Sequence, residues 1–300
     1  MEDVWELLPE SLRRQVEALP AGDKGRIEEI RLRLGQPFSI VFPEGERLFP
    51  NDKVRQEALA WVLERASQHS IHTVLDQVRN GFVTVQGGHR LGLCGTGVVE
   101  RGELTNLRTV SSLALRQARE VRGLAKSVAP QLFQEGRLAN TLILAAPGKG
   151  KTTLLRDLVR VISAGEGCPA LRVGLADERG EVAAMWEGVP MLDVGPRTDV
   201  MDRCPKSIGM ITLLRGMSPQ VLAVDEITRE EDAQALLQAV GCGVSLLATA
   251  HGARLADLGR RSVYRALAAE GAFEKIVLID GTGNKRRYEV VRWEAQAWSR

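Results

Sequence analysis

The chain has 300 residues, 44% of them hydrophobic and 26% charged, which is typical of a globular protein large enough for two hydrophobic cores. Its 40 basic and 38 acidic residues leave a formal net charge of +2, so the overall charge does not indicate a nucleic-acid or anionic-membrane partner. The four cysteines form no Cys-x-x-Cys pair, and no apolar run reaches the roughly 18 residues of a membrane helix, so we expect a cytoplasmic protein that is at most peripheral to a membrane.

The first part of the chain is predicted to form a small α+β domain. Residues 27–49 contain short strand-like segments separated by glycine and proline, and residues 58–66 predict a helix. Residues 81–95 predict two further strands that meet at Gly87-Gly88.

The segment 120–130 contains a glycine, a proline and little hydrophobic periodicity, which is typical of a linker. We therefore expect an N-terminal α+β domain over residues 1–125. A second domain is expected over residues 126–300.

From Thr141 onward, apolar strand-like runs alternate with helical patterns. The predicted strands are residues 142–145, 172–177, 221–226 and 244–251. The predicted helices are residues 152–163, 181–187, 206–217, 229–240 and 255–269, and residues 193–200 are rich in turn formers. Such alternation indicates an α/β fold in which helices cover both faces of a mostly parallel sheet. Residues 273–280 and 285–293, joined by a turn at 281–284, predict an antiparallel hairpin that completes the sheet.

The strongest motif is Ala145 to Thr152, AAPGKGKT, which leads from an apolar run through a Gly-rich loop into an amphipathic helix. This layout is typical of a phosphate-binding loop, in which backbone N–H groups and a helix N-terminus surround a polyphosphate. We expect Lys151 to contact the β- and γ-phosphates of ATP and the Thr152 hydroxyl to coordinate Mg²⁺. The residues expected to bind the nucleotide are Pro147, Gly148, Lys149, Gly150, Lys151, Thr152 and Thr153.

Ala145 stands where the usual pattern G-x-x-x-x-G-K-[ST] begins with glycine. An alanine still permits the loop if its φ is negative, so we expect the loop to form. The alternative is a Gly-rich turn between strand and helix that binds no ligand.

Two acidic residues, Asp225 and Glu226, end the predicted strand at 221–226. At the carboxyl edge of a parallel sheet, Asp225 can hold Mg²⁺ and Glu226 can orient or deprotonate the attacking water. The alternative is an acidic strand end that caps the next helix.

Asp177 and Glu178 end the predicted strand at 172–177, and His251 ends the one at 244–251. The two acids can contact Mg²⁺ or water, or they can begin a helix whose dipole favours negative charge. His251 can sense the γ-phosphate or the metal shell, because ligands gather at the carboxyl ends of strands in open α/β sheets. The alternative for His251 is a structural role.

Seven segments occur in one order along most of the chain: IEEIRLRLGQP, GGHRLGLCG, the phosphate loop, ADERGE, DVGPRTDV, MSPQVLAVDEI and ATAHG. Together they resemble the stage III sporulation protein AA family of ATPases from endospore-forming bacteria. They are more distantly similar to the hexameric ATPases of type II and type IV secretion systems. The resemblance implies a RecA-like core behind a smaller N-terminal domain, and a homo-oligomeric ring, expected to be a hexamer, with ATP between subunits.

The resemblance also assigns roles to residues. It matches Asp177 and Glu178 to an acidic box and His251 to a histidine box, and this supports catalytic roles for Glu178 and His251 beside Lys151 and Glu226. It implies that arginines of the N-terminal domain reach the phosphates, with Arg90, Arg101, Arg108, Arg116, Arg119 and Arg122 as candidates. The implied role is to power a membrane channel between mother cell and forespore from the mother-cell cytoplasm.

Two other functions are compatible with the motifs. A nucleotide-gated binder of single-stranded nucleic acid would use the basic segment from Arg101 to Lys126, but the near-neutral charge and the 4% aromatic content argue against it. A scaffold that binds ATP for assembly would have little turnover.

Overall fold

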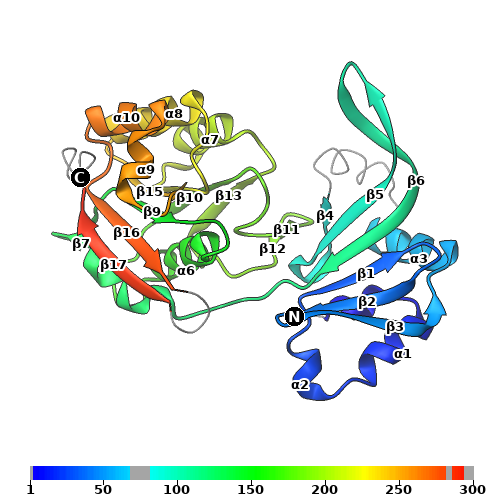
Figure 1. Ribbon diagram of the computed structural model, residues 1–300. Coiled ribbons are helices and arrows are strands. Elements are labelled where there is room, and N and C mark those ends of the chain that lie inside the picture. The colour runs from blue at the N-terminus through cyan, green and yellow to red at the C-terminus, as the bar shows by residue number, and fades with distance from the viewer. Residues whose placement is uncertain (1–2, 68–81, 282–285, 294–300) are drawn as a thin grey trace. The chain divides into compact units, whose positions relative to one another are not determined.

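The computed structural model describes residues 3–67, 82–281 and 286–293 (Figure 1). In this described part, no helix combines the length and the apolar character needed to cross a membrane. The turn predicted at 281–284 lies mostly outside it, since residues 282–285 are not described.

The chain is divided between two compact units. Unit 1 contains Met1–Arg119 and Ala184–Met191, and unit 2 contains Glu120–Ala183 and Leu192–Arg300. The domain boundary expected at 125/126 lies close to the end of the first stretch and stays a prediction.

Unit 1 contains an antiparallel sheet of six strands in the order β3-β2-β1-β6-β5-β4. The strands are β1 Glu29–Arg33, β2 Pro37–Phe42, β3 Gly45–Lys53, β4 Phe82–Thr84, β5 Arg90–Glu100 and β6 Glu103–Arg116. The helices are η1 Val4–Leu7, α1 Glu10–Glu17, α2 Ala21–Lys24, α3 Gln56–Ser67 and η2 Gln86–Gly88. Alternate strand residues such as Leu32, Ile40 and Leu115 fill one core, because every second side chain faces the same side of a sheet.

The predicted strands and helix of unit 1 are confirmed, but β6 was not predicted from the sequence. It forms a long hairpin with β5 (Figure 1), and the pairing shifts register at three places, beginning between Cys94 and Gly95. Such bulges interrupt the alternation of apolar residues that predicts a strand.

Unit 2 contains a seven-stranded sheet in the order β13-β10-β14-β15-β9-β16-β17, parallel except for β17. Its strands are β9 Thr141–Ala145, β10 Val173–Asp177, β13 Thr198–Asp202, β14 Val221–Val224, β15 Ser245–His251, β16 Lys275–Asp280 and β17 Arg287–Arg292, and a separate short pair is β7 Phe133–Gln134 with β8 Arg137–Leu138. The predicted α/β class and the antiparallel last strand are therefore confirmed.

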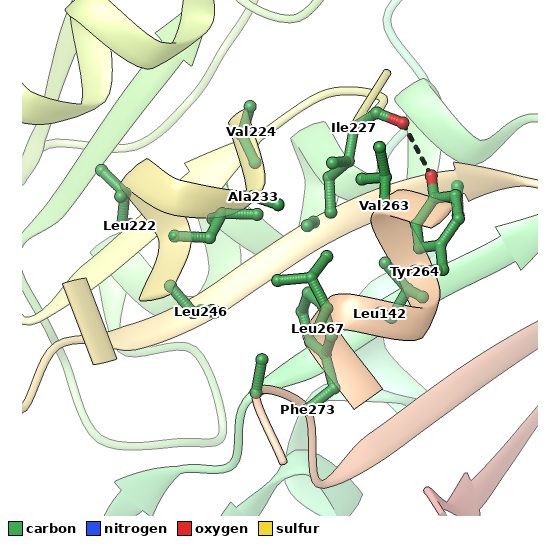
Figure 2. Close-up of a cluster of buried hydrophobic side chains, with 14 of the residues drawn as sticks. Leu142, Leu222, Val224, Ile227, Ala233, Leu246, Val263, Tyr264, Leu267 and Phe273 are labelled. Atoms are coloured by element: carbon green, nitrogen blue, oxygen red, sulfur yellow. Dashed lines mark hydrogen bonds between the residues drawn. The ribbon is translucent and has the colours of Figure 1, made fainter. Parts of the chain in front are cut away.

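Helices cover both faces of this sheet. They are η3 Ala125–Ser127, α5 Ala129–Leu132, α6 Lys151–Ala164, α7 Lys206–Met217, α8 Glu230–Gly241, α9 Leu255–Gly259 and α10 Ser262–Ala269. The helices α7, α8 and α10 lie on one face and α6 lies on the other (Figure 1). Leu142, Leu222 and Leu246 point from the strands into a core with Ala233 of α8 and Tyr264 of α10 (Figure 2). The central strands are buried on both faces, which explains their continuous apolar sequence.

Two helix predictions for this part are wrong, and one strand was not predicted. The helix predicted at 255–269 is two helices, because Arg261 is extended (φ −104°, ψ 127°) between α9 and α10. The turn-rich segment at 193–200 leads into β13, an edge strand with half-buried residues, so it lacks the apolar run of its neighbours. The helix predicted at 181–187 is instead a loop followed by the short strand pair β11 Met185–Trp186 and β12 Val189–Pro190.

The failed helix at 181–187 has a local cause. The backbone N–H groups of Glu181, Val182 and Ala183 all donate to the carboxylate of Asp177. Ala184 then takes a positive φ of 49°, which a right-handed helix does not allow.

Candidate functional site

The phosphate loop has the conformation that its sequence requires. Ala145 ends β9 and is not among the residues with positive φ, whereas Gly148 and Gly150 have φ of 73° and 93°. Side chains at these two glycines would be strained, and a Cβ at Gly148 would meet no atom within 4 Å. Ala145 thus meets the backbone condition set for it, and phosphate binding by the loop stays a prediction.

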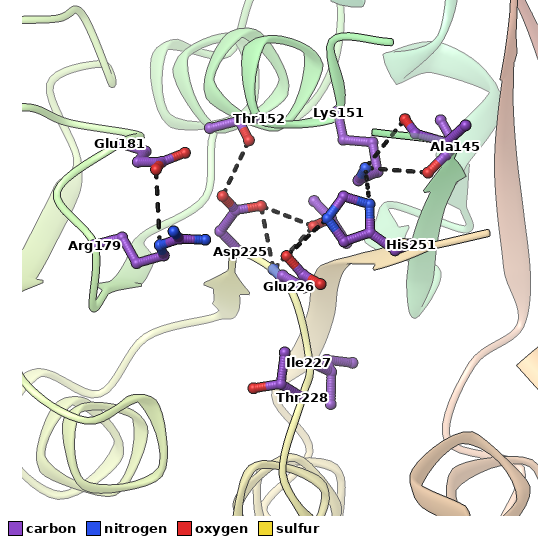
Figure 3. A network of polar contacts seen from close by, with 12 residues as sticks. Ala145, Lys151, Thr152, Arg179, Glu181, Asp225, Glu226, Ile227, Thr228 and His251 are labelled. Carbon is purple, nitrogen blue, oxygen red and sulfur yellow. Dashed lines mark hydrogen bonds and ion pairs between the residues drawn. The ribbon is translucent and has the colours of Figure 1, made fainter. Parts of the chain in front are cut away.

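Lys151 is the first residue of α6 and is buried. Its Nζ donates to the carbonyl oxygens of Ala145 at 3.0 Å and Ala146 at 3.4 Å, and to Nδ1 of His251 at 2.6 Å (Figure 3). Burial lowers the pKa of Lys151, against the opposing effect of the Glu226 and Asp225 carboxylates. The amine is thus held at the base of the loop by three acceptors.

Asp225 follows β14 and joins two hydroxyl groups. Its Oδ2 accepts a hydrogen bond from Thr152 at 3.0 Å, and its Oδ1 accepts one from Thr249 of β15 at 2.7 Å (Figure 3). The backbone N–H of Glu226 also donates to Thr249, at 2.9 Å. Three segments that are far apart in sequence therefore meet at one carboxylate.

Glu226 lies against His251. The distance between Oε2 of Glu226 and Nε2 of His251 is 2.9 Å. Because Lys151 donates to the other ring nitrogen, a neutral imidazole with its proton on Nε2 satisfies both contacts. Glu226 has a positive φ of 26°, a strained conformation that is frequent at functional sites.

The turn that follows Glu226 is anchored from α10. The hydroxyl of the fully buried Tyr264 donates to the carbonyl of Ile227 at 2.8 Å (Figure 2). Burial raises the pKa of Tyr264, so the hydroxyl stays a donor at neutral pH. This hydrogen bond fixes the chain two residues beyond Asp225.

Asp177 and Glu178 make other contacts. The Asp177 carboxylate accepts the three N–H groups of the following loop, and burial raises the pKa of Asp177 to about 6. Glu178 forms an ion pair with the buried Lys206 of α7, with Nζ and Oε2 3.1 Å apart. Asp177 begins no helix, so that alternative is wrong, and its contact with Mg²⁺ or water stays a prediction. The catalytic role of Glu178 stays a prediction.

The remaining predicted residues of the loop are more accessible. Pro147 and Gly148 are exposed, and Lys149, Gly150 and Thr153 are half-buried. The N–H of Lys149 lies 3.4 Å from the carbonyl oxygen of Ala146. The loop thus presents its middle to solvent while Lys151 is buried beneath it.

Several of the candidate arginines have partners in their own unit. In unit 1, Arg116 pairs with Glu29 at 3.0 Å, Arg119 donates to the Ile27 carbonyl at 2.8 Å, and Arg90 lies over the ring of Phe82. In unit 2, Arg122 pairs with Glu120 and Asp193. These contacts neutralise positive charge that a nucleic-acid-binding surface would need. Which of the arginines acts on phosphate stays open, and the role itself stays a prediction.

Sequence reasoning missed four residues around the site: Arg156, Lys206, Thr249 and Arg286. Arg156 of α6 donates to the carbonyls of Val182 and Glu181. The available signal was polarity inside apolar segments, since Thr249 is fully buried within β15 and Arg156 is buried within α6.

The donor set fits magnesium better than a metal held by protein alone. In the described part of the chain there is no group of three or more His, Cys, Asp or Glu side chains able to hold a metal. Thr152 and Asp225 instead offer a hydroxyl and a carboxylate oxygen close together. Mg²⁺ commonly binds through one or two such oxygens and keeps its remaining positions for water and phosphate.

Solved structures share this fold. The ATPase DotB of Legionella pneumophila is 14% identical with a TM-score of 0.59, and the match covers 94% of this chain and 79% of that one. The pilus retraction motor PilT, solved with bound ADP, is 16% identical with a TM-score of 0.61, and the match covers 89% of this chain and 79% of that one. The predicted RecA-like core with a smaller N-terminal α+β domain is therefore confirmed.

Sequence comparisons identify the family. Stage III sporulation protein AA of Bacillus subtilis (strain 168) is 39% identical over 276 residues, which cover 92% of this chain and 89% of the relative. The protein SEEDLING PLASTID DEVELOPMENT 1 of Arabidopsis thaliana is 24% identical over 286 residues, but the match covers only 38% of that protein. The family model "Sporulation stage III, protein AA" matches residues 1–292. The chain belongs to the stage III sporulation protein AA family.

Proposed function

We propose that this protein is a motor that hydrolyses ATP with Mg²⁺. The observation that carries the proposal is the connected set of contacts from Lys151 through His251 to Glu226, beside the Thr152 to Asp225 hydrogen bond. All five side chains lie at the carboxyl edge of β9, β14 and β15, where ligands of open α/β sheets bind. The fold shared with a pilus retraction motor solved with ADP also supports it.

Each residue has a distinct task in this proposal. The backbone of Pro147 to Gly150 and the N-terminus of α6 bind the phosphates, and Lys151 neutralises their charge. Thr152 and Asp225 would hold Mg²⁺, which when bound stabilises negative charge on the phosphate oxygens. Glu226 orients the attacking water and accepts its proton. His251 holds Glu226 and Lys151 in place.

The proposal extends to assembly and location. We place the ATP-binding domain at residues 126–300, with subunits forming a hexameric ring and an arginine of a neighbouring N-terminal domain completing the site. The motor would act in the cytoplasm, against membrane channel components of sporulation. Analytical ultracentrifugation with and without ATP tests the ring, and a monomer under both conditions would contradict it.

Glu226→Gln tests the catalytic assignment. The substitution removes the proton acceptor but keeps the shape, so we expect ATP binding to remain and phosphate release to fall about 100-fold or more. Glu231→Gln is the matched control, because Glu231 is exposed in the first turn of α8. Equal phosphate release by Glu226→Gln and the parent protein would contradict the role of Glu226. A parent protein that forms rings and binds ATP without turnover would favour the scaffold.

A further inference from the structure

The C-terminal hairpin brings an arginine to the phosphate loop. β16 runs parallel to β9, with Leu278 opposite Leu144, so both strands end at the same edge of the sheet. β17 returns antiparallel from that edge, with Arg287 opposite Asp280. Arg286, directly before β17, therefore lies at the edge where the phosphate loop leaves β9.

The guanidinium group of Arg286 packs on Gly150. A Cβ atom at position 150 would lie 3.0 Å from Cζ of Arg286, and 3.1 and 3.3 Å from its two terminal nitrogens. All three atoms of the fork are thus close to the residue before Lys151. Gly150 provides both the positive φ of the loop and the space that this arginine occupies.

Arg286 is held in place without being neutralised. Among the described residues, its buried Nε has no hydrogen-bond partner and no carboxylate forms an ion pair with the side chain. The side chain is hydrogen-bonded with the hydroxyl of Tyr288, whose pKa rises because of burial and is lowered in part by Arg286. Tyr288 is thus a neighbour of the arginine but does not compensate its charge.

A purely structural arginine explains this arrangement less well. A buried donor without an acceptor costs free energy, and such donors in native proteins usually have a partner that is absent or a functional role. A phosphate group is the partner that the planar fork of an arginine binds best. The loop against which Arg286 packs is the one proposed to bind phosphate.

We propose that Arg286 is a nucleotide-binding residue whose guanidinium donates hydrogen bonds to phosphate oxygens of the nucleotide in the phosphate loop. This inference rests on the proposed function of that loop. It supplies a positive charge from within the same unit, in addition to Lys151. It also gives the C-terminal hairpin a task, because nucleotide binding would be coupled to the position of β17.

Calorimetric titration with Mg-ADP and with magnesium pyrophosphate tests the proposal. We expect Arg286→Gln to weaken binding of both probes by about 10-fold to 100-fold, the usual value of a hydrogen bond to a charged group. Arg286→Lys restores the charge without the fork and should recover part of the loss. The matched control is Arg287→Gln, which removes an exposed neighbouring charge and should change affinity by less than about 2-fold.

The outcomes separate this inference from the proposed function. If Lys151→Ala abolishes ADP binding while Arg286→Gln keeps the affinity of the parent protein, the role of Arg286 alone is overturned. An Arg286→Gln variant that loses affinity for ADP but not for pyrophosphate would also overturn the phosphate contact. A parent protein that binds neither probe would overturn the proposed function and this assignment with it.

Discussion

β10 and β14 are neighbouring parallel strands, and an Asp-Glu pair stands at the carboxyl end of each, at the same level of the sheet. Ala176 lies opposite Val224, so Asp177 and Asp225 leave the sheet side by side. Asp177 is 1% exposed, and both of its carboxylate oxygens accept hydrogen bonds from backbone N–H groups. Asp225 is half-buried and accepts hydrogen bonds from the hydroxyls of Thr152 and Thr249, which belong to other segments, and from the backbone N–H of Glu226.

The difference arises from the path of the chain after each strand. Beyond Asp177 the backbone curls over the carboxylate, and Arg156 binds two carbonyls of the same loop. Beyond Asp225 the chain moves away to α8, and Tyr264 holds it from behind at Ile227. The Asp177 carboxylate thus binds only its own loop, whereas the Asp225 carboxylate also joins hydroxyl groups of two other segments, and its role at a metal stays a proposal.

The largest expected effect is on turnover, from Asp225→Ala. It removes the proposed metal-binding carboxylate and the acceptor of two hydroxyls, so phosphate release should fall about 1,000-fold. The free energy of unfolding should change far less, because solvent reaches the site. Steady-state phosphate release and urea unfolding of the same preparation measure both. A variant that keeps most of its turnover would contradict the assignment of Asp225.

Asp177→Ala is expected to act on stability instead. It leaves the N–H groups of Glu181, Val182 and Ala183 without their acceptor, and should lower the free energy of unfolding by about 3 to 4 kcal/mol. Urea unfolding measures this loss. If the variant does not fold, Asp177→Asn keeps one acceptor oxygen and should fold with a smaller loss. A loss below about 1 kcal/mol for Asp177→Ala would show that the carboxylate does not support the loop.

The pH dependence of stability separates the two aspartates further. The pKa of Asp177 is raised by burial from its ordinary 3.8 to about 6, so between these values the folded protein binds more protons than the unfolded chain. The free energy of unfolding should therefore fall as pH rises through this window, by about 2 to 3 kcal/mol.

Comparison with Asp177→Asn isolates this contribution, because asparagine does not titrate. Chemical unfolding at pH 4 and pH 7 should show the stability difference between parent and variant shrinking as pH rises. A difference that stays constant, or that grows with pH, would contradict the raised pKa of Asp177.

A smaller effect is expected at Glu178, the glutamate that follows Asp177. Glu178→Gln should lower turnover about 10-fold, as loss of an outer partner of a metal site commonly does. Lys206→Met, which removes only the ion-pair partner of Glu178, should lower turnover less. Equal losses in both variants would indicate that the pair acts through structure, and unchanged turnover in Glu178→Gln would show that its predicted catalytic role is wrong.

Much of the fold of unit 2 was predictable because its strands and its main motif are visible in short stretches of sequence. β9, β10, β14 and β15 are continuous apolar runs. The motif from Ala145 to Thr152 combines glycines, a lysine and a threonine at a spacing that is typical of a phosphate-binding loop. The parallel arrangement then places Lys151, Asp225 and His251 at one edge without further information.

Other parts depend on contacts that no local pattern contains. The sequences ending in Asp177 and Asp225 are alike, and only the course of the following loop distinguishes their roles. Arg286 is far from Gly150 in sequence and reaches it through the pairing of β16 with β9. The edge strand β13 was missed because its residues are half-buried and polar, so it resembles a loop in composition.

The smallest expected effect concerns the anchor behind Asp225. Tyr264→Phe keeps the ring in the core but leaves the carbonyl of Ile227 without its donor, so the free energy of unfolding should fall by about 1 kcal/mol. Turnover should change little if the strand and the Thr152 and Thr249 hydroxyls suffice to place Asp225. Urea unfolding and phosphate release measure the two quantities, and unchanged stability would contradict the contribution of this hydrogen bond. A loss of turnover larger than the loss of stability explains would mean that Asp225, like Asp177, depends on the loop beyond it.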